Sequence, residues 1–131
     1  MHAFQTLAGL GMPLGIITNH TPEIRPVIEA TLGGYVEPKN IVISGEEGIY
    51  KPDRSIFLNA AARLGLPAKQ CLYIGDNLEV DAMGAVASGF AGGIWCDRSG
   101  LPPSENLPPN VYRITELGQI LPSISGYQHG N

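Results

Sequence analysis

The sequence lacks several features that would assign it to a specialised class of protein. Among its 131 residues no apolar run approaches the ~20 residues of a membrane-spanning helix. Basic residues form no run and the net charge is −4, so neither nucleic acid nor an anionic membrane is an expected partner. The first residues show no basic stretch followed by an apolar core, so no secretory signal is expected. These absences predict a cytoplasmic protein.

Cysteine is also scarce. The chain has only Cys71 and Cys96, each inside an apolar run of strand character, and we expect both thiols to be buried and free. The remaining composition, 44% hydrophobic and 15% charged, is ordinary for one globular domain. We expect residues 1–121 to form that domain and residues 122–131 to be a poorly ordered tail.

Strand-like and helix-like segments alternate along the chain. Short apolar runs that end in polar residues or glycine predict strands at residues 14–19, 41–44, 71–74, 92–96 and 111–114. Apolar positions at helical spacing, together with capping residues and closing glycines, predict helices at residues 4–10, 21–32, 53–64, 79–88 and 115–121. A loop is predicted between residues 45 and 52. Strands separated by helices indicate right-handed crossovers, and therefore a Rossmann-like α/β fold with a three-layer arrangement: a parallel sheet with helices on both faces.

Polar and charged side chains that could bind a ligand lie at or near the predicted strand ends. Thr18 and Asn19 end the first strand, Lys51 precedes a helix, and Asp76 and Asp81 follow the third strand. Each feature alone is most simply a turn or a helix cap. In parallel sheets, however, ligands bind at the carboxyl ends of the strands. A hydroxyl and an amide can hold phosphate oxygens there, a lysine can neutralise their charge, and two carboxylates about one helical turn apart can hold magnesium.

Three segments resemble known signature motifs. Residues 16–19, 48–57 and 73–82 resemble the second, third and fourth motifs of the haloacid dehalogenase superfamily, in the same order and at suitable spacing. The resemblance covers roughly residues 4–121. It implies the magnesium-dependent phosphohydrolase branch, because the true dehalogenases of this superfamily need no metal and lack the Gly-Asp…Asp pattern.

The resemblance implies a role for each of these residues. Thr18 would donate its hydroxyl to the transferring phosphoryl group, helped by the backbone amide of Asn19. Lys51 would balance the charge of phosphate and nucleophile, and Thr18 and Lys51 are thus the expected catalytic residues. Asp76 would bind Mg²⁺ directly, and Asp81 directly or through water. Two loop residues are expected to support the metal ligands: Asn77 and Glu79. The expected substrate is a small phosphorylated metabolite.

The family's first motif has no counterpart in the sequence. That motif is an Asp-x-Asp pair at the end of the first, central strand, and its first aspartate is the nucleophile. None of the four aspartates of this chain lies two residues from another, and none precedes Thr18. We therefore expect the chain to lack that strand and any cap domain, a small helical cap being the best match for the parent protein. The parent would hydrolyse phosphate esters through an aspartyl-phosphate, whereas this chain would be inactive.

Loss of a central strand leaves two apolar edges without a partner, which favours association. Three outcomes are open: direct pairing of the two edges, a homodimer that shares strands, or complementation by another chain. For function, the alternative is a non-catalytic binding or interaction module derived from the same core. A phosphoacceptor receiver domain is disfavoured, because its acidic pair comes first and its lysine last, the reverse of the order here.

Overall fold

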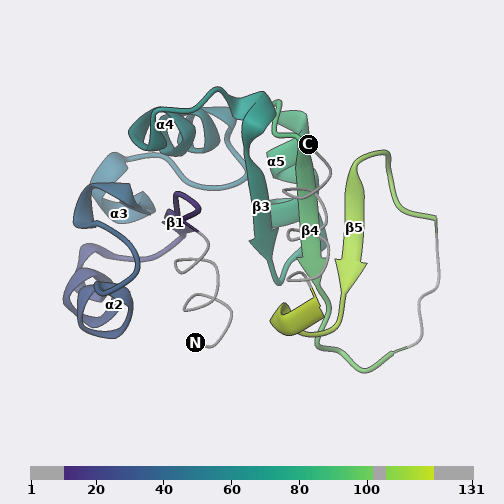
Figure 1. Ribbon diagram of the computed structural model, residues 1–131, viewed down its shortest axis with the longest axis horizontal. Helices are drawn as coiled ribbons and strands as arrows, with labels where there is room; N and C mark the ends of the chain where they lie inside the picture. The colour runs from purple at the N-terminus through teal and green to yellow at the C-terminus, as the bar shows by residue number, and fades with distance from the viewer. Residues whose placement is uncertain (1–10, 102–105, 120–131) are drawn as a thin grey trace.

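The computed structural model describes residues 11–101 and 106–119 and has an α/β fold in which every paired strand is parallel (Figure 1). Its strands are β1 (Ile16–Thr18), β2 (Ile41–Ile43), β3 (Leu72–Gly75), β4 (Gly92–Cys96) and β5 (Val111–Ile114). Its α-helices are α2 (Arg25–Leu32), α3 (Ser44–Glu47), α4 (Arg54–Leu64) and α5 (Gly84–Ala87). Shorter turns are η1 (Pro22–Ile24), η2 (Pro38–Asn40), η3 (Ala68–Gln70), the π-helical η4 (Leu78–Met83) and η5 (Leu117–Gln119). The predicted fold class is confirmed.

The described strands form two separate sheets. In one, β1 pairs with β2, with Ile17 opposite Val42. In the other, the order is β3-β4-β5, with Gly75 opposite Trp95, and β5 is the outer edge strand, as predicted. Within the described residues β1 and β3 do not pair, so the possibility that these two edges join directly is wrong.

Helix α4 joins the two sheets through a common core. Its buried face carries Ile56, Phe57 and Ala61, and these residues pack in one cluster with Ile17 of β1 and with residues of β2, β3 and α5. Figure 1 shows α4 beside both β1 and β3. Two aromatic contacts strengthen this cluster, since the Phe57 ring meets Tyr73 and Phe90 edge to face at centroid distances of 5.4 and 5.6 Å. The sheets are therefore held together by a helix rather than by strand pairing.

Local signals placed most elements correctly. Asp53 caps α4 by accepting a hydrogen bond from the backbone N–H of Ser55 at 2.8 Å, and Gly65 ends the helix with φ +74°. The loop predicted for residues 45–52 is partly wrong, because α3 forms one helical turn there. The helix predicted for residues 79–88 begins instead as the wider turn η4 and continues as α5.

Some of the remaining predictions concern described residues, and others concern residues outside the described ranges. Cys71 and Cys96 are buried and free, as predicted. The last helix is reduced to η5 within the described residues. The helix predicted at residues 4–10 and the tail at residues 122–131 lie outside the described residues. No helix in the described ranges has the length and apolar character needed to cross a membrane.

Candidate phosphate and metal site

Asn19 fixes the backbone of Lys51. Its side-chain Oδ1 accepts a hydrogen bond from the Lys51 N–H at 2.8 Å, and its Nδ2 donates to the Lys51 carbonyl at 3.0 Å. The two residues are 32 positions apart in sequence. Thr18, half-buried, immediately precedes this clamp at the end of β1. The end of β1 is therefore joined to Lys51 through Asn19.

The Lys51 side chain crosses from the β1 side to the β3 side of the molecule. Its Nζ donates to Asp81 Oδ1 at 2.7 Å and to the Tyr73 hydroxyl at 3.0 Å. The pair is well shielded from water, with 11% of the Lys51 side chain and 5% of the Asp81 side chain exposed. The Tyr73 hydroxyl donates in turn to the Ile17 carbonyl at 2.8 Å, so the chain of contacts returns to β1.

Asp81 is held by the geometry of the loop before it. Its Oδ2 accepts a hydrogen bond from the Asn77 N–H at 3.1 Å, while the Asn77 side chain caps η4 by accepting from the Val80 N–H at 2.8 Å. A Cβ added at Gly75 would lie 2.3 Å from the Asp81 carboxylate. Only glycine at position 75 leaves room for the carboxylate to lie against the strand.

The second carboxylate has a different environment. Asp76 is exposed, and together with Asn77 and Glu79 it lines an open depression that continues to residues 95–99, at the end of β4 and just beyond it. Glu79 is exposed as well. Asp76 and Asp81 are therefore close in the chain, but one faces solvent and the other faces Lys51.

The electrostatic balance at Lys51 follows from these contacts. Burial lowers the pKa of Lys51, whereas the negative charge that Tyr73 carries once it ionises, the charge of Asp81 and the hydrogen bonds to both residues raise it, and the net result is a raised pKa. Burial also raises the pKa of Tyr73, although the neighbouring Lys51 opposes that effect. Lys51 is thus a fully charged ammonium at neutral pH, and Tyr73 is a neutral hydroxyl.

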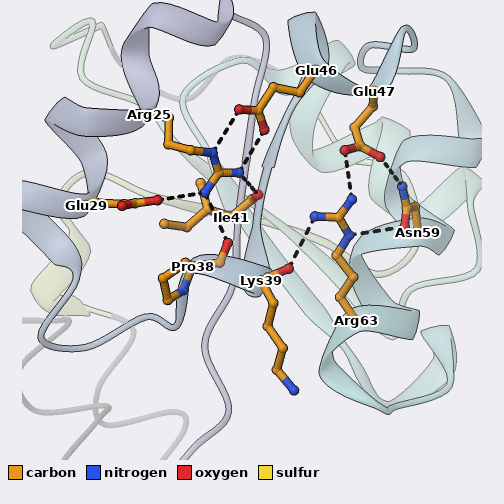
Figure 2. A network of polar contacts seen from close by, with 9 residues as sticks. All are labelled: Arg25, Glu29, Pro38, Lys39, Ile41, Glu46, Glu47, Asn59 and Arg63. Carbon is orange, nitrogen blue, oxygen red and sulfur yellow. Dashed lines mark hydrogen bonds and ion pairs between the residues drawn. The ribbon is translucent and has the colours of Figure 1, made fainter.

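Two arginines hold α3, the helical turn that precedes Lys51 (Figure 2). Arg25 donates to both carboxylate oxygens of Glu46 at 2.8 Å, to Glu29 and to the carbonyls of Pro38 and Ile41.

On the other side of α3, Arg63 donates to Glu47 Oε2 at 2.7 Å, and Asn59 donates to the other oxygen of the same carboxylate at 2.7 Å. Adjacent glutamates, Glu46 and Glu47, are thus tied to α2 and α4, respectively. This network holds α3 in place, and α3 leads directly into the loop that carries Lys51.

The carboxylates of the site are the candidate ligands for a cation. In the described part of the chain, no three His, Cys, Asp or Glu side chains come together in an arrangement that could hold a metal. The site therefore offers Asp76 and Asp81 alone, and magnesium commonly uses only one or two carboxylates, completing its shell with water and phosphate oxygens. The close approach of Asp81 to the backbone at Gly75 leaves the carboxylates near the same strand end. The residues present fit Mg²⁺ in the number and chemistry of their oxygens.

Tyr73 is the participant that the sequence did not reveal. It lies in a run of apolar residues that predicts only a buried strand. A usable signal was present, because a buried tyrosine hydroxyl needs a hydrogen-bond partner. Its partners, Ile17 and Lys51, are 56 and 22 positions away in sequence, so local pattern could not identify them.

Comparison with known proteins decides the family. A sequence profile of the haloacid dehalogenase-like hydrolases matches residues 1–89. The chain belongs to this family. Mouse N-acylneuraminate-9-phosphatase is 36% identical over 87 residues, which make up 64% of this chain and 35% of that protein. Phosphoserine phosphatase of Thermus thermophilus is 30% identical over 112 residues, or 84% of this chain and 43% of that protein.

The structural relatives of this haloacid dehalogenase-like chain agree. The crystal structure of a haloacid dehalogenase phosphatase from Thermococcus onnurineus superposes with a TM-score of 0.80 at 27% identity, covering 96% of this chain and 56% of that one. The chain thus spans about a third to a half of the curated relatives described above. Membership of a family of hydrolases that includes phosphatases is established for the core that these proteins share.

Proposed function

We propose that this chain forms the phosphate- and magnesium-binding part of a phosphoric monoester hydrolase that acts on a small phosphorylated metabolite. The observation that carries the proposal is the position of Lys51, which is clamped by Asn19 on one side and paired with Asp81 on the other. An ammonium that is fixed beside a carboxylate, on a backbone held to the end of β1, suits a phosphoryl group, because catalysis of phosphoryl transfer depends mainly on positioning and on charge stabilisation. The related proteins named as phosphatases support the same reading.

Each side chain has a specific task in this proposal. The Thr18 hydroxyl and the Asn19 backbone N–H bind phosphate oxygens, and Lys51 neutralises their charge. Asp76 and Asp81 hold Mg²⁺, which when bound would supply further positive charge against the phosphate. Asn77 orients Asp81 through its backbone N–H, and exposed Glu79 lies beside Asp76 in the wall of the open depression.

Turnover needs one further group. In the family the nucleophile is the first aspartate of an Asp-x-Asp pair, and none of the aspartates in these 131 residues belongs to such a pair. We therefore propose that these residues bind magnesium and phosphate but do not by themselves form the aspartyl-phosphate through which the intact protein would act.

Magnesium binding is the direct test. Amide NMR shifts should move at residues 75–81 when MgCl₂ is added to the chain. Asp76→Asn should abolish these shifts while leaving the fold intact, because Asp76 is exposed. Glu37→Gln, which removes another exposed carboxylate, just before η2, should leave them unchanged. Equal magnesium affinity in Asp76→Asn and the unmodified chain would contradict the proposal.

Turnover is tested separately with p-nitrophenyl phosphate in the presence of Mg²⁺. The chain is expected to give no release of p-nitrophenol above that of the Asp76→Asn variant. Robust turnover that Asp76→Asn abolishes would overturn the proposed inactivity while supporting the magnesium site.

A further inference from the structure

The open depression beside Asp76 has a second wall, which residues 95–99 form at the end of β4 and just beyond it. The pairing of β3 with β4 brings the two walls together, because Gly75, the residue before Asp76, lies opposite Trp95. Neighbouring strands lie about 4.8 Å apart, so the segments that follow β3 and β4 are close in space. A ligand held at Asp76 can therefore extend along residues 95–99.

Hydrogen bonds hold this second wall in a fixed shape. Asp97, which is 7% exposed, accepts from the Ser99 N–H at 3.0 Å and from Arg113 Nε at 2.9 Å. Arg113 also donates to the Leu101 carbonyl at 3.1 Å, and its guanidinium lies 5.9 Å from the centre of the Trp95 ring. The loop that follows β4 is therefore tied to β5, and its position is set before a ligand binds.

Arg98 is the cation of the second wall. It is exposed and lines the depression, and its neighbour in sequence, Asp97, is already paired with Arg113. Arg25 and Arg63, by contrast, are bound to glutamates on the flank of the molecule. Within the described part of the chain, the guanidinium of Arg98 makes no hydrogen bond or ion pair, so its N–H donors are available to a ligand in the depression.

The other charges of the depression are acidic. In the proposed function Asp76 holds Mg²⁺, and the carboxylate of Asp97 is balanced by Arg113. Glu79 and Arg98, both within the described residues, line the depression without pairing with each other. Once magnesium is bound at Asp76, Arg98 is the group of the second wall that attracts a negative charge.

We propose that Arg98 determines specificity by binding a second anionic group of the substrate, a carboxylate on the alcohol part of the phosphate ester. A guanidinium offers parallel N–H donors that match the two oxygens of a carboxylate. The proposal rests on the function proposed above, because the phosphate at the magnesium site fixes the near end of the substrate. The substrate class is then the phosphate esters of hydroxy acids.

The separation of the two walls suits a short ester of this class. In the register of β3 and β4, Asp76 lies one residue beyond the level of Trp95, and Arg98 lies three residues beyond it. At about 3.3 Å per residue along the strands and 4.8 Å between them, the two Cα atoms are separated by roughly 8 Å. The phosphate ester of a three-carbon hydroxy acid, together with the Arg98 side chain, spans a distance of this size.

Two phosphate esters that differ in one group are the probes. 3-Phosphoglycerate carries a carboxylate where glycerol 1-phosphate carries a hydroxymethyl group. Their binding to the ¹⁵N-labelled chain in MgCl₂ is followed by amide shifts at residues 75–81 and by the fluorescence of Trp95, the only tryptophan, which lines the depression. 3-Phosphoglycerate should bind about fivefold more tightly, as expected for an ion pair at an exposed site.

Three variants assign this preference to Arg98. Arg98→Met removes the charge and should abolish the preference, while the affinity for glycerol 1-phosphate stays the same. Lys69→Met, which removes an exposed cation in η3, before β3 begins, should keep the fivefold preference. Glu79→Gln removes a negative charge from the depression and should increase the preference. Circular dichroism confirms that each variant folds.

The outcomes separate this proposal from the function on which it rests. Equal affinity of the unmodified chain for the two esters would overturn the role of Arg98, as would a preference that persists in Arg98→Met. In both cases the binding of glycerol 1-phosphate would still support the phosphate site. If neither ester shifted the amides of residues 75–81, the phosphate site itself would be contradicted, and the role of Arg98 with it.

Discussion

The ion pairs around Arg25 and Arg63 lie on the flank of the β1–β2 half, whereas the Lys51–Asp81 pair lies between the two sheets. The two arginine side chains keep 25% and 28% of their surface exposed, but Lys51 keeps 11% and Asp81 only 5%. On the flank, water can replace a lost partner, and such pairs contribute little individually. Between the sheets, removal of one partner leaves the other charge buried, which is far more costly. An ion pair on the flank therefore affects mainly its own neighbourhood, whereas the buried Lys51–Asp81 pair affects the stability of the whole fold.

The largest expected effect comes from breaking the buried pair. Asp81→Asn should lower the free energy of unfolding by about 3 kcal/mol, because Lys51 would remain buried without a counter-charge. Urea denaturation followed by circular dichroism measures this loss. Asp76→Asn removes an exposed carboxylate from the same loop and should change stability by no more than about 0.5 kcal/mol. If both variants lost the same free energy of unfolding, burial of Asp81 would not explain its contribution to stability.

The same pair can be disturbed from the backbone. Gly75→Ala places a methyl group 2.3 Å from the Asp81 carboxylate, which must move away from Lys51. We expect a loss of about 2 kcal/mol. In a double-mutant cycle with Asp81→Asn, the two losses should be clearly less than additive, since both act on one contact. Full additivity would show that Gly75 is needed for some other reason.

A smaller effect is expected on the flank. Arg25→Met should destabilise the chain by about 1 kcal/mol, because its contacts are charged but partly exposed. Arg54→Met, at an exposed position at the start of α4, is the matched control and should be nearly silent. The difference between Arg25→Met and the unmodified chain should shrink when NaCl is raised to about 1 M, whereas the Asp81→Asn effect should persist.

The smallest effect concerns the ion pair of the β4–β5 half, in which Arg113 Nε donates to Asp97 Oδ2 at 2.9 Å. Hydrogen bonds from Ser99, and secondarily from Arg113, lower the pKa of Asp97 below its ordinary 3.8. A lowered pKa contributes stability that is present above pH 3.8 and is lost as the pH falls through the folded-state value. The stability difference between the unmodified chain and Asp97→Asn should therefore be constant near neutrality and narrow below pH 3.8. A difference that widens in acid would contradict the assigned direction.

Much of this architecture could be predicted because its signals are local. The strand at residues 92–96, the cap at Asp53 and the closing Gly65 depend on neighbours within a few residues. The order of Thr18, Lys51 and Asp76 likewise indicated a common strand-end site, and the structure brings Lys51 and Asp81 into contact.

The parts that were not predicted depend on distant partners. Helix α3 contains Gly45, a weak helix former, and Arg25 and Arg63 bind its two glutamates from helices before and after it. The π-helical turn η4 places two backbone N–H groups, those of Asp81 and Ala82, on the Asn77 carbonyl, a geometry that apolar periodicity cannot distinguish from an α-helix. The hydrogen bonds of Tyr73 likewise join it to Lys51 and to the Ile17 carbonyl, which are 22 and 56 positions away in sequence.

The two hydrogen bonds between Asn19 and Lys51 depend on a side chain that can be lost by deamidation. The amide works because one of its atoms accepts from the Lys51 N–H while the other donates to the Lys51 carbonyl. Asparagine is among the less durable residues at high temperature, and spontaneous loss of its side-chain ammonia yields aspartate. A carboxylate at position 19 would still accept from the N–H, but its second oxygen would face the Lys51 carbonyl without a proton between them. Ageing at this one exposed side chain would therefore release the loop that carries the lysine, while the cores on both sides remain folded.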